Sequence, residues 1–289
     1  MATSMAESPP SSLVAFPNAK INLGLQIREK RADGYHAINS VFIPIPWCDT
    51  LEIATPAHRT TGCELHLGGH PIQGTITDNL VHQAYELLNG QFQLPPADFH
   101  LIKAIPSGAG LGGGSADGTF TLRLLNEHFG LGLQATQLEE LAESLGSDCP
   151  FFVRNAPANV TGRGELISPI SLELDGWHVA LIHPGIHVPT NTAFQWVTPK
   201  KDRPGLAQWN GSSPLDWSGK ILNDFTHPVG QRHPEIHQAL TLLHAAGATF
   251  ADMSGSGSAV FGFFPTSPPE DLFKNCPNHW RTWSGSARI

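Results

Sequence analysis

The chain has 289 residues, of which 40% are hydrophobic and 15% charged, and its formal net charge is −8. This composition is typical of a globular protein with enough apolar side chains for one large or two modest domains. The acidic balance and the lack of a basic stripe argue against a nucleic-acid partner, and no apolar run approaches the length of a membrane span.

The amino-terminal twelve residues, MATSMAESPPSS, contain no basic region followed by an apolar core. We therefore expect residues 1–12 to be a short disordered extension and not a signal peptide. The four cysteines are far apart and form no C-x-x-C motif. Disulfides and a zinc site are not expected, and a cytoplasmic location fits the sequence.

The first predicted element is a strand over residues 13–27, where apolar side chains alternate with small or polar ones. Lys20 lies at the start of this alternation, and a solvated strand end is its simplest interpretation. Asp33 and Gly34 then indicate a tight turn. On the pattern alone, the following Tyr35 is an aromatic flank of a hairpin.

Two helices and a strand are predicted around the middle of the chain. Asp78 is expected to cap a helix that runs to about Leu88, with Gly90 as its stop. A short strand over residues 99–102 ends at Lys103, which alone could be an ordinary exposed lysine. A helix over residues 136–145 follows later, with Thr136 and Glu139 as a capping box.

Between these elements lies the most distinctive stretch, residues 103–120, KAIPSGAGLGGGSADGTF. Its five glycines between Gly108 and Gly114 need positive φ angles and leave room for a ligand against the backbone. A glycine loop that leads into a helix directs backbone N–H groups and the positive end of the helix dipole at one spot. We predict a phosphate site here. A plain surface turn is the alternative, but it would need only one or two glycines.

Three known phosphate loops do not fit. The Walker loop ends in Gly-Lys-Ser or Gly-Lys-Thr, whereas Gly114 is followed by Ser115 and Ala116. The dinucleotide pattern G-x-G-x-x-G occurs, but a second helix follows where a βαβ unit requires a strand. The protein-kinase loop would need later His-Arg-Asp and Asp-Phe-Gly tripeptides, and neither is present.

The segment GSDCPFF follows the 136–145 helix and contains Asp148 in a predicted turn before an apolar strand. A turn aspartate after a helix is common. A carboxylate held beside Phe151 and Phe152 would instead be partly desolvated, which makes it a stronger base. Proline and glycine cluster near Asp175, and we therefore predict two domains, over residues 13–174 and 175–289.

Taken together, these motifs resemble the GHMP small-molecule kinases, such as galactokinase, homoserine kinase and mevalonate kinase. The resemblance is carried by P-x-G-x-G-L-G-G-G-S, N-A-K-I-N-L, G-S-D-C-P-F-F, N-D-F and M-S-G-S-G-S, which occur in the family's order over roughly residues 14–264. It implies an α+β fold of two domains, an N-terminal one like ribosomal protein S5 domain 2 and a C-terminal ferredoxin-like one, with the active site in the cleft between them.

The resemblance also implies an activity, the transfer of the γ-phosphoryl group of ATP to an alcohol. Lys20 and Asp148 match the family's catalytic positions, with Asp148 as the base. Ser115 is the expected Mg²⁺ ligand. The residues expected to bind ATP are Lys103, Pro106, Ser107, Gly108, Ala109, Gly110, Leu111, Gly112, Gly113, Gly114, Ser115 and Ala116.

The triple glycine and the D-G-Y-H segment resemble one branch of this family, whose small-molecule substrate is a cytidylated methylerythritol of the non-mevalonate isoprenoid pathway. There Tyr35 would stack on the cytosine, His36 would bond its edge, and Asn22 and Phe194 would also bind substrate. The phosphorylated group would be the 2-hydroxyl. We expect a monomer or weak homodimer that binds neither nucleic acid nor membrane.

Other functions stay open on the sequence. A mevalonate- or homoserine-type kinase would share the loop but has no use for D-G-Y-H. A non-catalytic binding module would be expected to lose Asp148 or Lys20, and a dinucleotide oxidoreductase lacks its βαβ context. Two departures from the family occur in the loop: Ala116 replaces a second serine, and Gly118 inside the helix costs about 1 kcal/mol relative to alanine.

Overall fold

The computed structural model describes residues 12–288. The predicted extension, residues 1–12, lies outside them except for Ser12, which begins the first strand. The chain forms two compact units, each built from separate segments. Unit 1 contains the chain up to Pro17, Asp49–Ala104 and Gly114–Val153, and unit 2 contains Asn18–Cys48, Ile105–Gly113 and the chain from Arg154 on. These units interleave along the sequence, and the continuous division at residue 175 stays a prediction.

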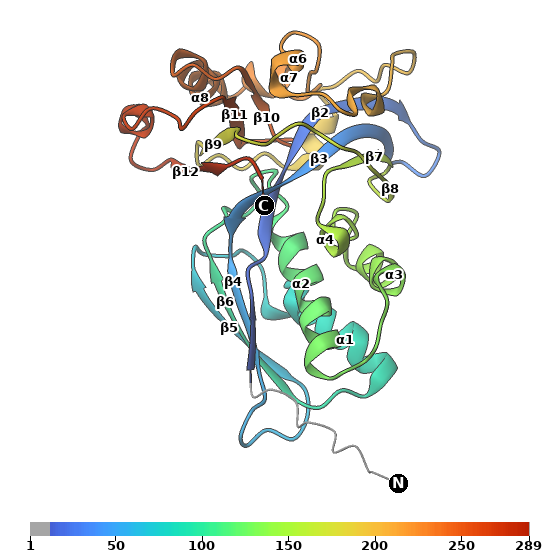
Figure 1. Ribbon diagram of the computed structural model, residues 1–289. Coiled ribbons are helices and arrows are strands. Elements are labelled where there is room, and N and C mark those ends of the chain that lie inside the picture. The colour runs from blue at the N-terminus through green and yellow to red at the C-terminus, as the bar shows by residue number, and fades with distance from the viewer. Residues whose placement is uncertain (1–11, 289) are drawn as a thin grey trace. The chain divides into compact units, whose positions relative to one another are not determined.

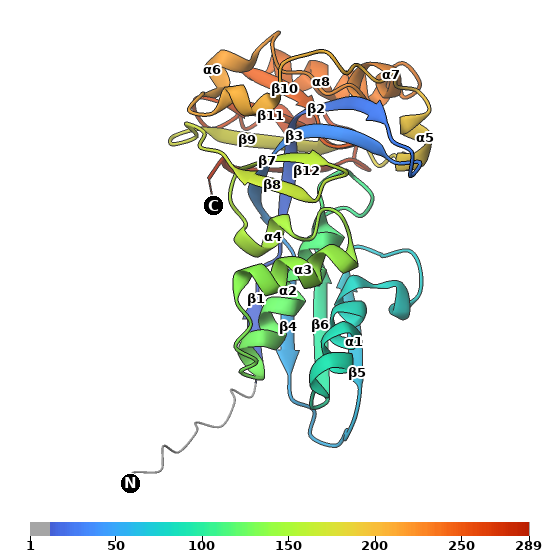
Figure 2. The same ribbon diagram turned by 90° about the vertical axis from the view of Figure 1, so that its right-hand side faces the viewer.

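Unit 1 is a four-stranded sheet with helices α1, α2 and α3 on one face (Figures 1 and 2). The strands, in sheet order, are β1 (Ser12–Ala15), β4 (Thr50–Ala54), β6 (Ala97–Lys103) and β5 (Cys63–Gly69), with only the β5–β6 pair parallel. The helical elements are η1 (Ile76–Asp78), α1 (Leu80–Phe92), α2 (Gly113–His128), α3 (Ala135–Leu145) and α4 (Phe151–Arg154).

The core of unit 1 follows from two sequence periods. In β6 every second residue from Ala97 to Lys103 is buried, which is the alternation of a strand with one covered face. In α1 the buried positions are three and four residues apart, the spacing of one helix face. The helices therefore pack their apolar faces on one face of the sheet, and the other face of the sheet stays exposed.

Several predicted boundaries in unit 1 are wrong. Asn79, not Asp78, caps α1, because the Asn79 side chain accepts from Val81 N while the Asp78 carboxylate is engaged by Thr75. The helix also continues through Gly90 to Phe92.

Two further corrections concern the segment after α2. The capping box of α3 is formed by Gln134 and Gln137 instead of Thr136 and Glu139. The apolar residues after Asp148 form the short helix α4 and not a strand, because Phe152 N donates back to Cys149 O and turns the chain.

Unit 2 contains two antiparallel four-stranded sheets. One has the order β2 (Asn18–Lys30), β3 (His36–Cys48), β7 (Ala158–Gly162) and β8 (Leu166–Pro169). The other has the order β10 (Phe250–Met253), β11 (Val260–Phe264), β9 (His178–His183) and β12 (Arg281–Ser286). The helical elements are α5 (Thr190–Phe194), η2 (Leu206–Trp209), α6 (Pro214–Trp217), α7 (Thr226–Gly230), α8 (Pro234–Ala245) and η3 (Leu272–Asn275).

Strand β9 is buried on both faces and joins two cores. Val179 and Leu181 pack in one cluster with Ile21 and Ile43 of the β2–β3 sheet. Ala180 and Ile182, which point the other way, pack in a second cluster with the buried face of α8 (Figure 1). A continuous apolar run such as the one in β9 is therefore what a doubly covered strand requires. The predicted α+β fold class is confirmed.

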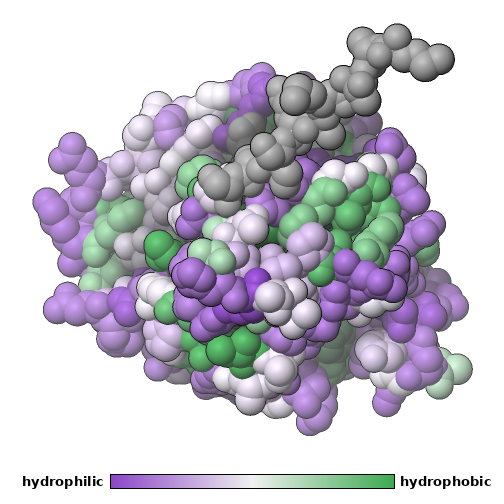
Figure 3. Space-filling view, turned by 90° about the horizontal axis from the view of Figure 1, so that it is seen from below, coloured by the Kyte–Doolittle hydropathy of each residue, from purple (hydrophilic) through white to green (hydrophobic). Residues whose placement is uncertain are grey.

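The face drawn in Figure 3 is mainly hydrophilic, and its apolar areas are separate from one another. Single exposed apolar side chains such as Val14 and Ile102 are normal on a protein surface. Among residues 12–288, no helix has both the length and the apolar character that a membrane span requires.

Gly118 lets α2 approach α1 closely. A Cβ atom at this position would lie 2.8 Å from the Cβ of Leu80, which cannot move without its backbone. The glycine is thus required by helix packing, and this offsets its low helix propensity.

We predict opposite effects for two Gly→Ala changes in neighbouring helices. Gly118→Ala should lower the free energy of unfolding by about 1–3 kcal/mol because of the clash with Leu80. Gly90→Ala in α1 meets no atom within 4 Å and should be neutral or stabilising by up to about 1 kcal/mol. Thermal and urea unfolding of both variants measure this. Equal stability of the two variants would contradict the packing role.

Candidate active site

The predicted phosphate loop has the backbone of an anion site. Gly108, Gly110 and Gly112 have φ angles of +66°, +80° and +70°, and α2 begins at the next residue, Gly113. Alternation of left-handed with ordinary residues turns successive N–H groups inward, and the start of a long helix adds its positive dipole. Residues Ser107, Gly108 and Gly114 are exposed, whereas Pro106, Ala109, Leu111 and Gly113 are buried. The loop thus holds its apolar side chains inside and leaves its glycine backbone accessible.

The loop is fixed by main-chain contacts within unit 2. Lys20 N donates to Leu111 O at 2.8 Å, and Ala259 N donates to Ala109 O at 3.0 Å. Ser254 Oγ donates to Gly110 O at 2.8 Å. A Cβ on Gly110 would lie 2.2 Å from Ser254 O, so only glycine fits there. The loop is therefore locked between strand β2 and the segment before β11.

Lys20 and Asn22 lie on one face of β2, because they are two residues apart. The Lys20 Nζ donates to Asn22 Oδ1 at 2.7 Å and lies 4.4 Å from the centre of the Phe42 ring. Asn22 Nδ2 donates to Ser40 Oγ at 3.0 Å, and its N donates to Ser254 Oγ. Lys20 is buried, which excludes the solvated strand end. A buried ammonium held this firmly is suited to stabilising negative charge.

Asp148 belongs to unit 1 and lies half-buried in the turn between α3 and α4. The next residue, Cys149, accepts a 2.8 Å hydrogen bond from Thr119 Oγ1 through its carbonyl. Thr119 is one turn after Ser115 in α2. Burial raises the pKa of the Cys149 thiol to about 11, which makes it a poor nucleophile. Unit 1 therefore presents Ser115 and Asp148 from two adjoining elements, the first turn of α2 and the turn before α4.

Lys103, predicted to bind ATP, is buried in an ion-pair cluster of unit 1. Its Nζ contacts the Asp117 carboxylate at 2.6 Å and also the Asp49 carboxylate. Asp49 Oδ1 accepts from Ala104 N, so this carboxylate bonds the main chain as well. Sequence reasoning missed both aspartates. The charge pattern around the loop, Lys103 before it and Asp117 after it, was the available signal.

The protonation states in this cluster follow from burial. Burial raises the pKa of Asp117 to about 8 against the opposing pull of Lys103. Burial acts to lower the pKa of Lys103, but the two carboxylates outweigh it and the net direction is upward. The cluster thus pairs the buried Lys103 side chain with two buried acidic side chains, of which Asp117 favours its neutral form at pH 7. It ties the strand before the glycine loop to the helix after it.

The predicted nucleoside side chains come together in unit 2. Tyr35 is exposed at the turn between β2 and β3, with the Arg163 guanidinium 5.1 Å from its ring centre. His36 stacks on Phe194, with ring centres 4.5 Å apart and 12° between the planes. Phe194 also meets Phe225 edge-on. Burial, and next Lys30, lowers the pKa of His36, so the ring is neutral at pH 7 and can both donate and accept.

Two more residues near the loop had no predicted role. A Cβ on Gly108 would lie 2.7 Å from His187 Nδ1, so this histidine ring covers the start of the loop. Asn223 supports the segment around Ser254 through hydrogen bonds to Met253 O and Gly255 O. His187 is a single polar residue in an irregular segment, where neither periodicity nor spacing marks it. The N-D-F motif marks Asn223 but does not indicate which groups its side chain contacts.

Within residues 12–288, two clusters of His, Cys, Asp and Glu side chains have their ligand atoms within 4.8 Å of one another. Both are in unit 1, away from the glycine segment in sequence, and Arg59 pairs with two acids of one of them. The clusters are Cys63, His82 and Glu86, and Glu64, His66 and Asp98. The glycine loop itself carries two hydroxyl groups, those of Ser107 and, in the first turn of α2, of Ser115.

Comparisons with known proteins cover most of the chain. The model of the GHMP kinases N terminal domain matches residues 79–159, and that of the GHMP kinases C terminal domain matches residues 207–282. A 4-diphosphocytidyl-2-C-methyl-D-erythritol kinase of Bacteroides thetaiotaomicron is 46% identical over 87% of this chain and 92% of its own. A protein of the same name from Salinibacter ruber is 39% identical over 85% and 88%.

Solved structures agree in fold. A crystal structure of 4-(cytidine 5'-diphospho)-2C-methyl-D-erythritol kinase has a TM-score of 0.75 and 29% identity, and the match covers 94% of this chain and 98% of that one. A mevalonate kinase from Methanococcus jannaschii has a TM-score of 0.67 over 95% and 98%, at 13% identity. At that low identity the second likeness concerns the fold alone.

Replacement of Lys103 should distinguish a structural role of this residue from direct contact with ATP. Lys103→Met leaves two buried acids without their cation, and it should lower the free energy of unfolding by about 3–5 kcal/mol. Lys201→Met, which breaks an exposed pair with Glu29, should change stability little. Chemical unfolding compares them. A Lys103→Met protein of normal stability whose only defect is a raised KM for ATP would instead support direct phosphate contact.

Proposed function

Because the chain belongs to the GHMP kinases, and within them to the 4-diphosphocytidyl-2-C-methyl-D-erythritol kinase family, we propose that it phosphorylates that compound. The γ-phosphoryl group of ATP passes to the 2-hydroxyl, giving the 2-phosphate and ADP, in the non-mevalonate route to isoprenoid precursors. The observation that carries this proposal is the glycine nest over residues 108–112, which leads directly into α2. A cytoplasmic location and a monomer or weak homodimer remain predictions from the sequence.

The phosphates of ATP are assigned to the glycine loop. Its backbone N–H groups and the start of α2 form a rigid positive environment that needs no rearrangement when a phosphate arrives. Phosphoryl transfer depends on such positioning and charge neutralisation more than on covalent chemistry. Mg²⁺, when bound, would offset the charge of the phosphates, and the Ser115 hydroxyl is its proposed ligand. Ala116 is buried in α2, so the missing second hydroxyl is replaced by packing.

Proton and charge handling at the reacting hydroxyl is assigned to two residues. Asp148 accepts the proton of the 2-hydroxyl as the γ-phosphoryl group arrives. Lys20 contributes a buried positive charge that polarises the hydroxyl or the γ-phosphate, and Asn22 Oδ1 fixes its position.

The cytidine end of the substrate is assigned to the D-G-Y-H turn. The exposed Tyr35 ring offers a stacking face, and the neutral His36 ring offers hydrogen bonds to a base edge. The stack with Phe194 holds His36 in one orientation. A grip on the remote end of the substrate reduces the freedom that the reacting hydroxyl must otherwise lose. A direct contact between Phe194 and the base remains a prediction.

The proposed activity is tested by coupled measurement of ADP release with ATP, Mg²⁺ and the cytidylated alcohol, with mevalonate and homoserine in parallel. We expect turnover of the cytidylated substrate alone. Asp148→Asn should lower kcat by roughly 10²–10⁴-fold, the usual contribution of a general base. Turnover of another alcohol would agree with a GHMP kinase but would exclude the cytidylated alcohol as its substrate. Normal activity of a folded Asp148→Asn protein would exclude its role as base.

Removal of the stacking ring should affect one substrate selectively. Tyr35→Ala is expected to raise KM for the cytidylated substrate by about tenfold, since loss of a stacked aromatic contact costs about 1–3 kcal/mol, while KM for ATP stays near its normal value. Phe92→Ala removes another exposed aromatic side chain, at the end of α1, and serves as the control. Equal increases in both KM values would argue against stacking on cytosine.

A further inference from the structure

The glycine loop rests on a second irregular segment of unit 2, residues 254–259, which connects β10 to β11. The contact is close because no side chain separates the two backbones. The Cβ that Gly255 lacks would lie 3.2 Å from Gly110 Cα, and Ser254 bonds Gly110 O directly. Any displacement of residues 253–255 is therefore passed on to Gly110. What holds this segment in place also sets the position of the phosphate loop.

Asn223 holds the segment from its other side. Its side-chain Nδ2 donates to Met253 O at 2.7 Å and to Gly255 O at 2.8 Å, which uses both amide hydrogens. Its Oδ1 accepts from Phe225 N at 2.9 Å. The side chain is buried, with 4% of the residue exposed. One carboxamide therefore bonds the residues on both sides of Ser254, and Ser254 is the residue that contacts the glycine loop.

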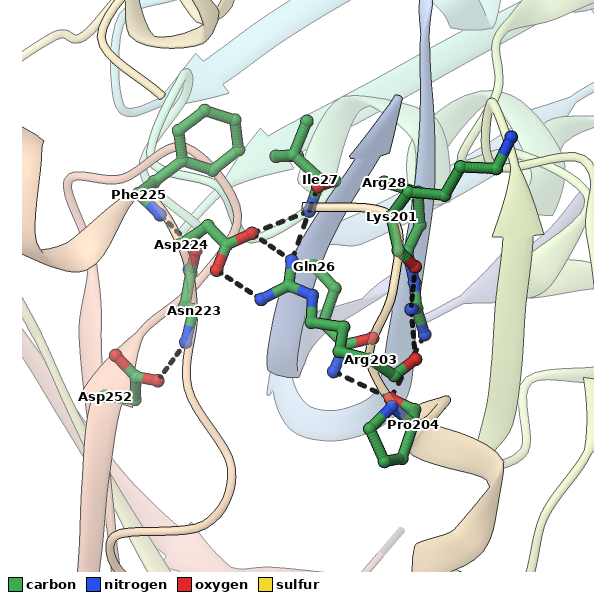
Figure 4. Close-up of polar contacts among 10 residues, drawn as sticks. All are labelled: Gln26, Ile27, Arg28, Lys201, Arg203, Pro204, Asn223, Asp224, Phe225 and Asp252. Carbon is green, nitrogen blue, oxygen red and sulfur yellow. Dashed lines mark hydrogen bonds and ion pairs between the residues drawn. The ribbon is translucent and has the colours of Figure 1, made fainter. Parts of the chain in front are cut away.

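Asn223 is itself anchored on two sides, as Figure 4 shows. Asn223 N donates to the buried carboxylate of Asp252 at 2.9 Å. The next residue, Asp224, accepts from Ile27 N at 2.8 Å and forms an ion pair with Arg203. Its backbone N donates to Leu25 O, which attaches this turn to β2. The same strand carries Lys20 and Asn22 further back.

The backbone turn around Asn223 also borders open space. A cleft of about 1170 Å³ lies within unit 2 and is lined in part by Asn223, Asp224, Thr226 and Asp252. None of the residues assigned to ATP or to the cytidylated substrate lines it. The asparagine is thus placed between this cleft and the segment that supports the phosphate loop.

We propose that Asn223 is a positioning residue for the ATP phosphates, acting through residues 253–255 on Gly110. The inference rests on the proposed function, because it takes the glycine loop as the ATP site. Loss of the two donated hydrogen bonds leaves two buried carbonyl groups unsatisfied, which favours a shifted backbone. A shift of the loop by a fraction of an ångström misaligns its N–H groups with the phosphates. The bond from Phe225 N to Asn223 Oδ1, next to Phe194, does not depend on the two lost donors.

The test replaces one carboxamide by a carboxylate of the same shape. Asn223→Asp keeps the acceptor for Phe225 N but can no longer donate to Met253 O and Gly255 O. The matched control is Asn39→Asp, because Asn39 is equally buried in unit 2, at 4% exposed, and bonds Asn159 and Leu206 instead. Binding of a non-hydrolysable ATP analogue is measured by calorimetry, and KM is measured for both substrates.

We expect Asn223→Asp to weaken binding of the analogue by about tenfold, equal to 1.4 kcal/mol, and to raise KM for ATP in parallel. KM for the cytidylated substrate should change little, and Asn39→Asp should leave the affinity for the analogue unchanged. A role in stability alone would lower the melting temperature of both variants without this selective loss. If Asn223→Asp does not fold, Asn223→Ser, which keeps one donor, is measured against the same expectation.

The possible failures are distinct. If the unchanged protein does not bind the analogue, the proposed function fails, and this inference fails with it. If the unchanged protein binds and the folded Asn223 variant binds equally well, the positioning role is overturned and the proposed function stands. Equal weakening by Asn39→Asp would also overturn it, because the effect would then belong to unit 2 as a whole.

Discussion

The structure depends on the direct contact of two backbones at Gly110. The carbonyl of Ser254 occupies the space that a side chain at residue 110 would need, with only 2.2 Å to a Cβ placed there. Because no flexible side chain lies between the two backbones, a shift of one of them must move the other. This contact lets a loop with three left-handed glycines hold one shape. The hydrogen bonds from Lys20 N and Ala259 N to the loop extend the same principle, since each joins main chain to main chain.

Much of this arrangement could be predicted from the sequence, where a local pattern has a local cause. Alternating side chains indicated β2, although the structure buries both faces of its first eight residues. The short strand predicted over residues 99–102 lies within β6. The glycine cluster indicated a loop whose backbone binds a ligand, because a plain turn needs only one or two glycines. Tyr35 and His36 could also be identified from the sequence, because they are neighbours in the local D-G-Y-H segment. The stack of His36 on Phe194 could not, because its partners are far apart in sequence.

What the sequence could not show are contacts set by tertiary packing. Lys103 looked like an exposed lysine or a nucleotide ligand, and its partners Asp49 and Asp117 are 54 and 14 residues away. The apolar pair after Asp148 has no period that distinguishes a strand from a helical turn, and the structure makes it α4. Asn223 is one amide in an irregular segment. Its importance comes from the two carbonyl groups that the fold brings to it.

The cleft behind Asn223 offers a route to selective inhibition. Compounds that copy ATP meet the problem that many unrelated enzymes bind the same nucleotide. A compound that fills this cleft would contact Asn223 and Asp252 without occupying the glycine loop. By drawing the Asn223 amide away from Met253 and Gly255, it would release the support of the loop and lower the affinity for ATP. High cellular ATP would then displace such an inhibitor only weakly, through its effect on the loop, because the two would not share a site.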